Sequence, residues 1–202
     1  RLLVAIGDYD AALIHFRKHE LPLHQRRGDE HDAAVTRGKI GDILMARGQL
    51  DEALRIRKEE ELPTFERLGD VRAKAVTQGK IADILMARGQ LDEALRIRKE
   101  EQLPVYERLG DVRAKAVTQG KIGDILMARG QLDEALALHE ARLPVAERMG
   151  DIGAIAHIRY SMANIRLQRG DDKRGGLQSI CADLAQAFAL LRKLGDAGGL
   201  GV

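Results

Sequence analysis

The sequence is poor in aromatic residues and has a single cysteine. Its 202 residues include three Tyr, three Phe and no Trp, so few rings are available to stack on bases or to fill a large apolar core. The lone Cys181 excludes an intrachain disulfide and a cysteine metal cluster. The shortage of rings disfavours nucleic acid as a partner.

Long apolar runs and one-sided charge are also missing. No stretch approaches the roughly 18 to 20 apolar residues that span a bilayer. The opening segment, residues 1–6, is too short for the core of a signal peptide. The 33 basic and 31 acidic residues are mixed along the chain and give a net charge of +2. We therefore expect a soluble cytoplasmic protein that does not enter a membrane.

An internal repeat is the strongest feature of the sequence. The segment Gly-Gln-Leu-Asp-Glu-Ala-Leu begins at three positions 41 residues apart, and the last unit is one residue shorter than the others. Two stretches, 69–95 and 110–136, differ only at Ala82 and Gly123. Such a period is typical of solenoids and propellers. The landmarks are Gly48, Gly89 and Gly130 for this segment, Gly28, Gly69, Gly110 and Gly150 for a Gly-Asp pair, and Pro22, Pro63, Pro104 and Pro144 for a Leu-Pro pair.

The periodicity inside one unit predicts two helices. Between residues 70 and 88 the apolar residues recur at steps of three and four, which is the helical period and defines helix A. Gly89 suits the left-handed position that ends a helix, and Asp92 and Glu93 suit the first turn of the next one. Helix B then runs from about 91 to 109, where Gly110 and Asp111 supply a stop and a new N-cap. Apolar positions are Ala73, Val76, Ile81, Ile84 and Leu85 in helix A, and Ala94, Leu95, Leu103 and Tyr106 in helix B.

The small residues of each unit resemble the signature of tetratricopeptide (TPR) repeats. In that family a small residue in helix A, a Gly at the turn and an Ala in helix B let the helices pack closely. The resemblance implies an all-α fold, a right-handed α-solenoid of antiparallel helical hairpins. The unit is 41 residues long where the family has about 34, which resembles the extended TPR subclass of bacterial signalling proteins. The matching triples are Gly41, Gly48 and Ala53, then Ala82, Gly89 and Ala94, then Gly123, Gly130 and Ala135.

The landmarks divide the chain into one array. We expect a partial repeat at 1–27, repeats at 28–68, 69–109 and 110–149, an atypical capping repeat at 150–194 and a flexible tail at 195–202. Residues 1–6 read as the stub of a truncated unit. A terminal repeat caps the stack because one of its faces meets water.

The prolines leave a structural alternative open. Helical phase continues across Pro104, so helix B is predicted to pass through the proline with a bend. A chain reversal at Leu103 and Pro104 would instead favour three helices in a HEAT-like unit.

Chemical motifs are weak throughout. His15 and His19 share a helical face beside Glu20, but a third metal ligand is not evident. The Gly-Lys pairs resemble the end of a phosphate-binding loop but lack its Ser or Thr, and Cys181 reads as a buried structural thiol. The mixed charges of 55–60 and 96–101 suit a solvated outer face. We expect no enzyme activity, no cofactor and no metal.

The candidate ligand groove follows from the resemblance, because helix A lines the concave face in that family. Residues at steps of three share one face of helix A, and stacked units would form columns of Lys, Asp and Met. Two interpretations stay open: a ligand groove, or Lys and Asp that only pair with each other while Met fills the core. The residues are Lys39, Asp42, Met45, Lys80, Asp83, Met86, Lys121, Asp124 and Met127, with His157, Tyr160, Ser161, Asn164 and Gln168 in the last unit.

The function that best fits is a scaffold that binds a peptide or protein segment in this groove, as the sensor part of a larger bacterial regulatory protein. The alternative is structural self-assembly, in which repeat ends stack between molecules and give a homo-oligomer.

Overall fold

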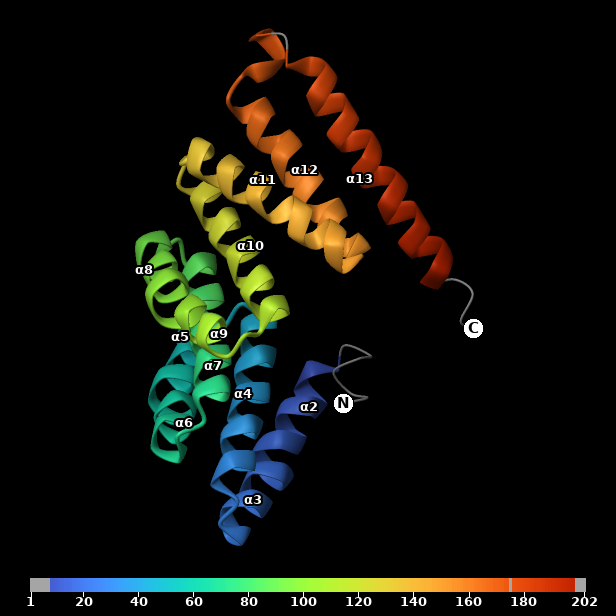
Figure 1. Ribbon diagram of the computed structural model, residues 1–202. Helices are drawn as coiled ribbons and strands as arrows, with labels where there is room; N and C mark the ends of the chain where they lie inside the picture. The colour runs from blue at the N-terminus through green and yellow to red at the C-terminus, as the bar shows by residue number, and fades with distance from the viewer. Residues whose placement is uncertain (1–7, 175, 199–202) are drawn as a thin grey trace. The chain divides into compact units, whose positions relative to one another are not determined.

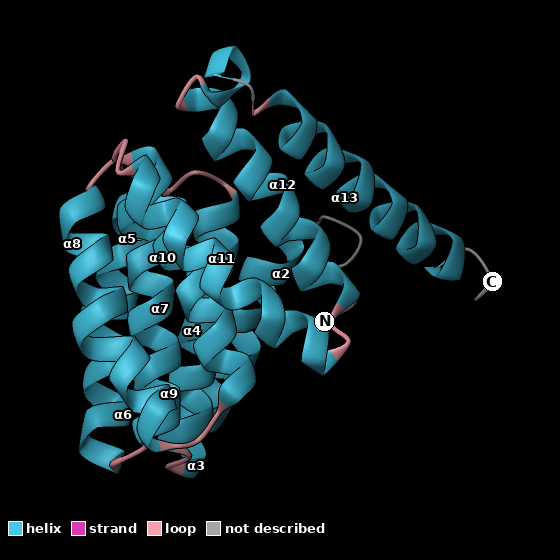
Figure 2. Cartoon of the chain, turned by 45° about the horizontal axis from the view of Figure 1, so that its top comes forward, coloured by secondary structure: helices cyan, strands magenta, loops and turns pink. Residues whose placement is uncertain are grey.

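The computed structural model describes residues 8–174 and 176–198. Within these residues every regular element is a helix, and the connections are short loops (Figures 1 and 2). The chain divides into two compact units, unit 1 up to Val112 and unit 2 from Arg113 onward. The predicted stub at residues 1–6 lies outside the described residues.

Helix A of each hairpin is a regular α-helix of 17 residues, as the periodicity predicts. Its first turn follows an Asp, and the side chains of Asp70 and Asp151 accept hydrogen bonds from the backbone N–H three residues later. This is an N-cap, which satisfies donors that have no partner inside the helix. The four helices are α4 (Glu30–Ala46), α7 (Val71–Ala87), α10 (Val112–Ala128) and α12 (Ile152–Gln168).

Glycine ends the helices at the predicted joints. Gly89 has φ of +75°, and the N–H of Gln90 donates to the carbonyl of Leu85 at 2.8 Å. This bond closes a Schellman motif, in which a left-handed residue lets two N–H groups cap the end of a helix. A β-carbon disfavours that conformation, which explains why Gly occupies the position.

Helix B of the first three hairpins is interrupted by a π-helical segment before the proline. The N–H of Leu103 donates to the carbonyl of Arg98, five residues back, and Leu103 keeps helical φ and ψ. The chain therefore continues through Pro104 without reversal, which contradicts the HEAT-like alternative. The segments are α2 (Tyr9–His15), η1 (Phe16–Glu20) and α3 (Leu21–Arg27); α5 (Leu50–Arg55), η2 (Ile56–Glu61) and α6 (Leu62–Leu68); α8 (Leu91–Arg96), η3 (Ile97–Gln102) and α9 (Leu103–Arg108).

The fourth helix B, α11 (Leu132–Met149), shows why the π-helical segments exist. It is a continuous α-helix with Pro144 inside, and it belongs to the unit that is one residue shorter. A π-bulge is an α-helix with one inserted residue. The period of 41 is thus a period of 40 with one extra residue, which the helix absorbs just before the proline.

Two further helices complete unit 2. The short 3-10 segment η4 (Asp171–Arg174) leads to α13 (Leu177–Gly198), which packs against α12. The described part of α13 extends beyond Leu194, past the predicted start of the flexible tail. Residues 199–202 lie outside the described range.

The core of each hairpin is built on the small residues that carry the TPR resemblance. Ala53, Ala82 and Ala94 are fully buried, and so are the Ile and Leu residues of the helix A stripe. A Cβ on Gly41 would lie 3.0 Å from Nε of Arg57, so helices A and B touch at this point. One residue of the predicted stripe, Val76, is instead 45% exposed.

Candidate ligand groove between helices A

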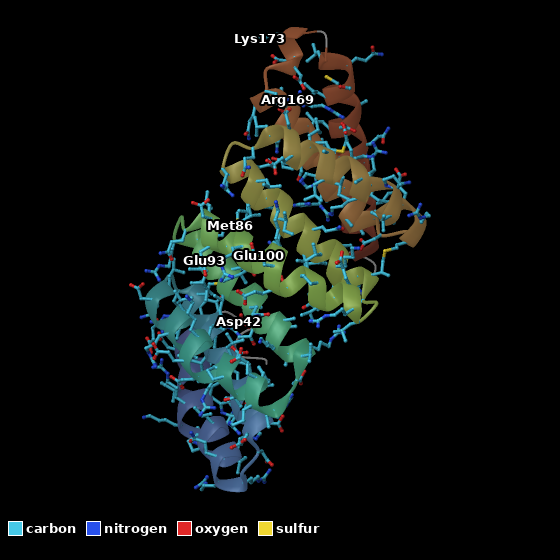
Figure 3. All side chains as sticks on the ribbon, turned by 60° about the vertical axis from the view of Figure 1, so that its left-hand side comes forward. Asp42, Met86, Glu93, Glu100, Arg169 and Lys173 are labelled. Atoms are coloured by element: carbon cyan, nitrogen blue, oxygen red, sulfur yellow. The ribbon has the colours of Figure 1, made fainter. Side chains whose placement is uncertain are left out.

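A groove of about 360 Å³ lies between α4 and α7 in unit 1. Three of the predicted site residues, Lys39, Asp42 and Lys80, line it. Met45, Asp83 and Met86 lie further along the same helices and do not line it; Figure 3 labels Asp42 and Met86. We call this space the helix A groove. Its other principal lining residues are His31, Val35, Asp70, Arg72 and Val76 from the helices A and the residue before α7, with Arg57, Glu61 and Phe65 from helix B.

The floor of the groove is a buried ion pair. Arg57 donates from Nη1 to Oε2 of Glu61 at 2.6 Å, and Thr77 donates from Oγ1 to Oε1 of Glu61 at 3.1 Å. Burial raises the pKa of the Glu61 carboxyl, and the charge and hydrogen bond of Arg57 oppose that rise. The charged segments 55–60 and 96–101, which were predicted to form a solvated outer face, thus contain buried residues. The expectation was wrong for Arg57 and its copy Arg98 because small residues of helix A, Gly38 and Gly41 opposite Arg57, leave room for long side chains.

Asp42 connects this floor to the rim of the groove. Its Oδ1 accepts from Nη2 of Arg57 at 2.7 Å and from Nζ of Lys80 at 2.9 Å. Asp42 and Lys80 are both about half exposed, while Arg57 is buried. A ligand in the groove would therefore meet a neutralised pair whose outer atoms remain accessible, and not a row of unpaired charges.

Lys39 lines the groove, but its ammonium contacts η1, the preceding helix B segment. Its ammonium donates to Glu20 and lies 5.3 Å from the centroid of the Phe16 ring, and Thr36 donates to the same carboxylate at 3.0 Å. Burial alone would raise the pKa of Glu20, but the hydrogen bonds of Lys39 and Thr36 with the charge of Lys39 outweigh burial and lower it. Lys39 is thus paired as well.

The next hairpin repeats the arrangement with one substitution. Arg98 donates from Nη2 to Oδ1 of Asp83 at 2.6 Å and from Nη1 to Gln102 at 2.5 Å. Gln102 stands where Glu61 stands in the previous hairpin, and its amide also donates to the carbonyl of Ala75 at 3.0 Å. A neutral amide can therefore fill the buried position.

The predicted site residues of unit 2 lie on α10 and α12. Lys121 and His157 both approach the carboxylate of Asp124, at 3.9 and 4.0 Å, which is looser than the pairs of unit 1. Tyr160 is exposed and Asn164 is half-buried. Ser161 is buried, Gln168 is exposed and Met127 is half-buried.

A buried histidine and arginine replace the Arg–Glu pair in unit 2. Nδ1 of His139 lies 3.2 Å from Nη1 of Arg142, and both side chains are buried. Burial lowers the pKa of His139 to about 4, and the charges of Arg142 and His157 act in the same direction. Burial also lowers the pKa of Arg142, which the charge of Asp124 opposes.

Sequence reasoning missed the apolar part of the groove. Val35 and Val76 line it and are exposed, although both belong to amphipathic helices. Each precedes the groove Lys by four residues and so shares its helix face. That repeated Val–Lys spacing is the signal that could have identified them.

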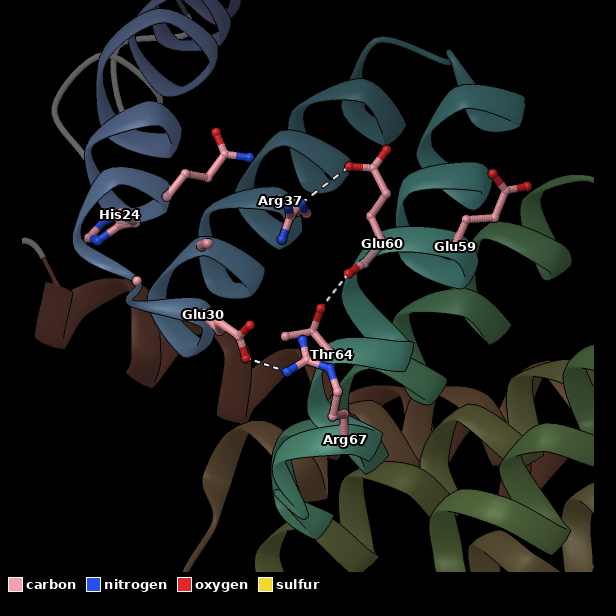
Figure 4. Close-up of a pocket in the computed structure, with 10 residues that line it drawn as sticks. His24, Glu30, Arg37, Glu59, Glu60, Thr64 and Arg67 are labelled. Atoms are coloured by element: carbon pink, nitrogen blue, oxygen red, sulfur yellow. Dashed lines mark hydrogen bonds and ion pairs between the residues drawn. The ribbon is translucent and has the colours of Figure 1, made fainter.

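A second pocket, of about 450 Å³, lies between α3, α4 and the helix B segments η2 and α6 (Figure 4). Its walls are dominated by charged side chains that pair across it: Arg37 with Glu60 at 3.2 Å, and Arg67 with Glu30. Because acids and bases both face the space, its electrostatics favour no single class of ligand.

The candidate metal ligands His15, His19 and Glu20 do not form a compact cluster. The rings of His15 and His19 lie 5.9 Å apart, and Nε2 of His15 lies 3.8 Å from Glu20. Over the described residues, no three His, Cys, Asp or Glu side chains gather closely enough to hold an ion. In the same part of the chain no helix is long and apolar enough to cross a membrane.

Solved structures of similar shape identify the fold. A Podosopora anserina protein described as a putative kinesin light chain with nearly identical TPR-like repeats superposes with a TM-score of 0.74 and 17% identity, covering 96% of this chain and 92% of that one. A variant of it gives 0.75 at 18%, covering 97% and 92%. The fold is TPR-like. BtubC (BKLC) of P. vanneervenii gives 0.79 at 18%, covering 96% of this chain and 77% of that one. No protein-family model matches the sequence, and no curated protein is significantly similar to it.

The TPR-like fold confirms the predicted fold class. In the 41-residue units, the one residue beyond a period of 40 resides in a π-helical segment of helix B.

Proposed function

We propose that the helix A groove binds an extended segment of a partner protein, so that the chain acts as a binding module and not as an enzyme. The observation that carries this proposal is the coincidence of two features in one groove: exposed Val35 and Val76 beside the half-exposed Lys80–Asp42 pair. A segment in this groove gains from apolar contact with both Val side chains. It also meets a hydrogen-bond donor, Lys80, and an acceptor, Asp42, whose positions are fixed by their own ion pair.

The rigid floor supports selectivity. Arg57 is held by Asp42 and Glu61 at once, so the polar rim is fixed before a ligand arrives. Preorganised sites bind more tightly because fewer side chains must be ordered on association. We further propose, from the resemblance to the extended TPR subclass, that the module forms part of a larger bacterial regulatory protein.

The test uses a random peptide library displayed on phage and selected on the full chain. Enriched peptides are then measured against a Val35→Glu/Val76→Glu variant and a control, Ile14→Glu/Leu68→Glu. The control adds the same charge at two exposed apolar positions outside the groove. We expect at least a tenfold loss of affinity for the groove variant only, since two Val contacts contribute about 1.4 kcal/mol or more.

Equal loss in both variants, or binding that survives in the groove variant and fails in the control, would refute this location. Circular dichroism of both variants checks that the helices are intact, so that a loss of binding reports on the surface.

A further inference from the structure

The last helix of unit 2 carries an apolar stripe beside the face that packs against α12. Ile180 and Ala187 are buried, and Asp183 beside them is held by Arg159 and Arg166 of α12. A second stripe lies about a quarter turn around the helix, and Phe188 at its centre is 60% exposed. We call this stripe the α13 outer face. Its residues follow one another at steps of four and three, the spacing of a helix–helix seam: Leu177, Cys181, Leu184, Phe188 and Leu191.

The exposure of this stripe overturns one expectation. Cys181 was predicted to be a buried structural thiol from its apolar surroundings, and it is exposed. The reason is that Ile180, one position earlier, takes the face toward α12. A capping helix is expected to show water a polar outer face. The outer face of α13 is apolar instead.

The neighbouring helix B shows what covers such a face. The Gly-Asp pairs at Gly150 and Gly195 align the sequence of α13 with that of α11 at a constant offset of 45 residues. The outer-face residues then match Leu132, Leu136, His139, Leu143 and Ala146 of α11. In α11 Leu136, His139 and Ala146 are buried and Leu132 and Leu143 are half-buried.

The cover of α11 is helix A of the following hairpin. The His157 ring of α12 lies 6.5 Å from the His139 ring, and Arg159 reaches Glu147 at 3.1 Å. Unit 1 follows the same rule, since Thr36 of α4 bonds Glu20 and Thr77 of α7 bonds Glu61. In each case helix A of the following hairpin covers the preceding helix B.

We propose that the α13 outer face is a docking site for an amphipathic helix of the helix A type that belongs to a partner protein. The site is uncharged along its centre, so the partner helix presents small and apolar side chains there. A second copy of this chain does not supply such a helix from α4, α7 or α12, because these already use that face internally.

A stapled peptide in solution tests the proposal. The peptide has the sequence of residues 151–169 with Arg159→Ala and Arg166→Ala, because α13 carries Arg192 and Ala185 at the positions where Glu147 and Glu140 of α11 pair with these two Arg residues. A hydrocarbon staple on its far face is needed, since an isolated helix of this length is marginal in water. The readout is the reaction of Cys181 with a disulfide reagent, because this thiol is the only one in the chain and lies in the stripe.

At a peptide concentration ten times its Kd, the reaction of Cys181 should slow roughly tenfold. Phe188→Asp places a charge at the centre of the stripe and should abolish this protection. Gln186→Asp adds the same charge on the opposite face of α13, about 200° from Leu184, and should leave protection unchanged. Circular dichroism shows whether both variants fold.

Two results would overturn the proposal. One is a reaction rate that the peptide does not change, or changes equally in the Phe188→Asp variant. The other is protection that appears without peptide and increases with protein concentration, because a second copy would then be the occupant. Neither result bears on the helix A groove, which lies in unit 1.

Discussion

Nη1 of Arg57 donates to Oε2 of Glu61 at 2.6 Å, four residues later across the π-helical segment η2, and both side chains are buried. The pair lies against Gly38, where an added Cβ would be 2.6 Å from Oε1 of Glu61. A charge that is buried without a partner is costly, whereas a buried pair can be replaced by neutral groups at little cost. Loss of the cation and loss of the anion should therefore have unequal effects on stability.

Arg57→Ala should lower the free energy of unfolding by about 3 to 5 kcal/mol, because it leaves Glu61 buried without its cation. Glu61→Gln should cost about 1 kcal/mol or less, because Gln102 already fills the equivalent position with bonds to Arg98 and to the carbonyl of Ala75. Urea unfolding followed by circular dichroism measures both. Similar losses in the two variants would show that the charge of the pair is not what matters.

Deletion of Glu100 should convert η3 into a regular α-helix with the fold retained. The fourth hairpin is the natural precedent, since it has one residue fewer and α11 runs through Pro144 without a π-helical segment. The deletion brings Arg98 and Gln102 to the three-residue spacing of His139 and Arg142. Helical content and a cooperative unfolding transition should both survive.

The matched control for that deletion removes Asp83 from α7. This helix has no extra residue to lose, so every later side chain turns by about 100° and the buried Ile84 and Leu85 rotate out of the core. We expect loss of the cooperative transition in the control. If both deletions behave alike, the extra residue of η3 is not a tolerated insertion.

Much of the fold can be predicted from the sequence because its signals are local. The Gly-Asp joints, the turn at Gly89 and the three- and four-residue steps each depend on nearby residues only, and the structure has helices at the expected places. The π-helical segments could not be predicted. A regular α-helix turns by about 100° per residue, and only the shorter fourth unit indicates that helix B of the other units holds one residue too many for that turn.

The candidate site could be predicted only in part because burial of charge depends on distant residues. Arg57 reads as a surface residue within a mixed run, but Gly41 on another helix leaves the space that its side chain fills. The spacing of Lys80 indicates the correct face, while its partner Asp42 lies 38 residues earlier. In unit 1 Lys39 and Lys80 both have acidic partners, Glu20 and Asp42, and each partner comes from another helix.

Gly41→Ala and Gly123→Ala should have opposite effects on stability. Ala already occupies the equivalent position in the third hairpin, where Ala82 is fully buried. Gly41→Ala should therefore stabilise unit 1 by up to about 1 kcal/mol, the helix propensity gained over Gly. At Gly123 a Cβ would lie 2.7 Å from Nε2 of His139, a rigid and buried ring, so Gly123→Ala should destabilise by about 1 to 3 kcal/mol. Thermal unfolding of the two variants measures the difference, and the same sign of effect in both would contradict this account of the contact.

Acidification should destabilise the chain through His139. Around its ring lie Arg142 on the same helix, His157 on α12 and, beside His157, Asp124 on α10. Burial, with the charges of Arg142 and His157, lowers the pKa of His139 to about 4 in the folded chain, while an unfolded histidine has a pKa of about 6.5. Above a pH of about 6.5 neither state binds the proton, and the full stability is present.

Between about pH 6.5 and 4 His139 binds a proton in the unfolded chain but not in the folded chain. This histidine alone therefore lowers the free energy of unfolding by up to about 1.4 kcal/mol for each pH unit of acidification. His139→Phe should remove that slope and keep the fold, because Phe16 is buried at the equivalent position of the first hairpin. The measurement is urea unfolding at pH 7, 6, 5 and 4.5 for both proteins, with His19→Gln as a control at an exposed histidine of unit 1. An unchanged pH slope in His139→Phe would show that other groups carry the acid sensitivity.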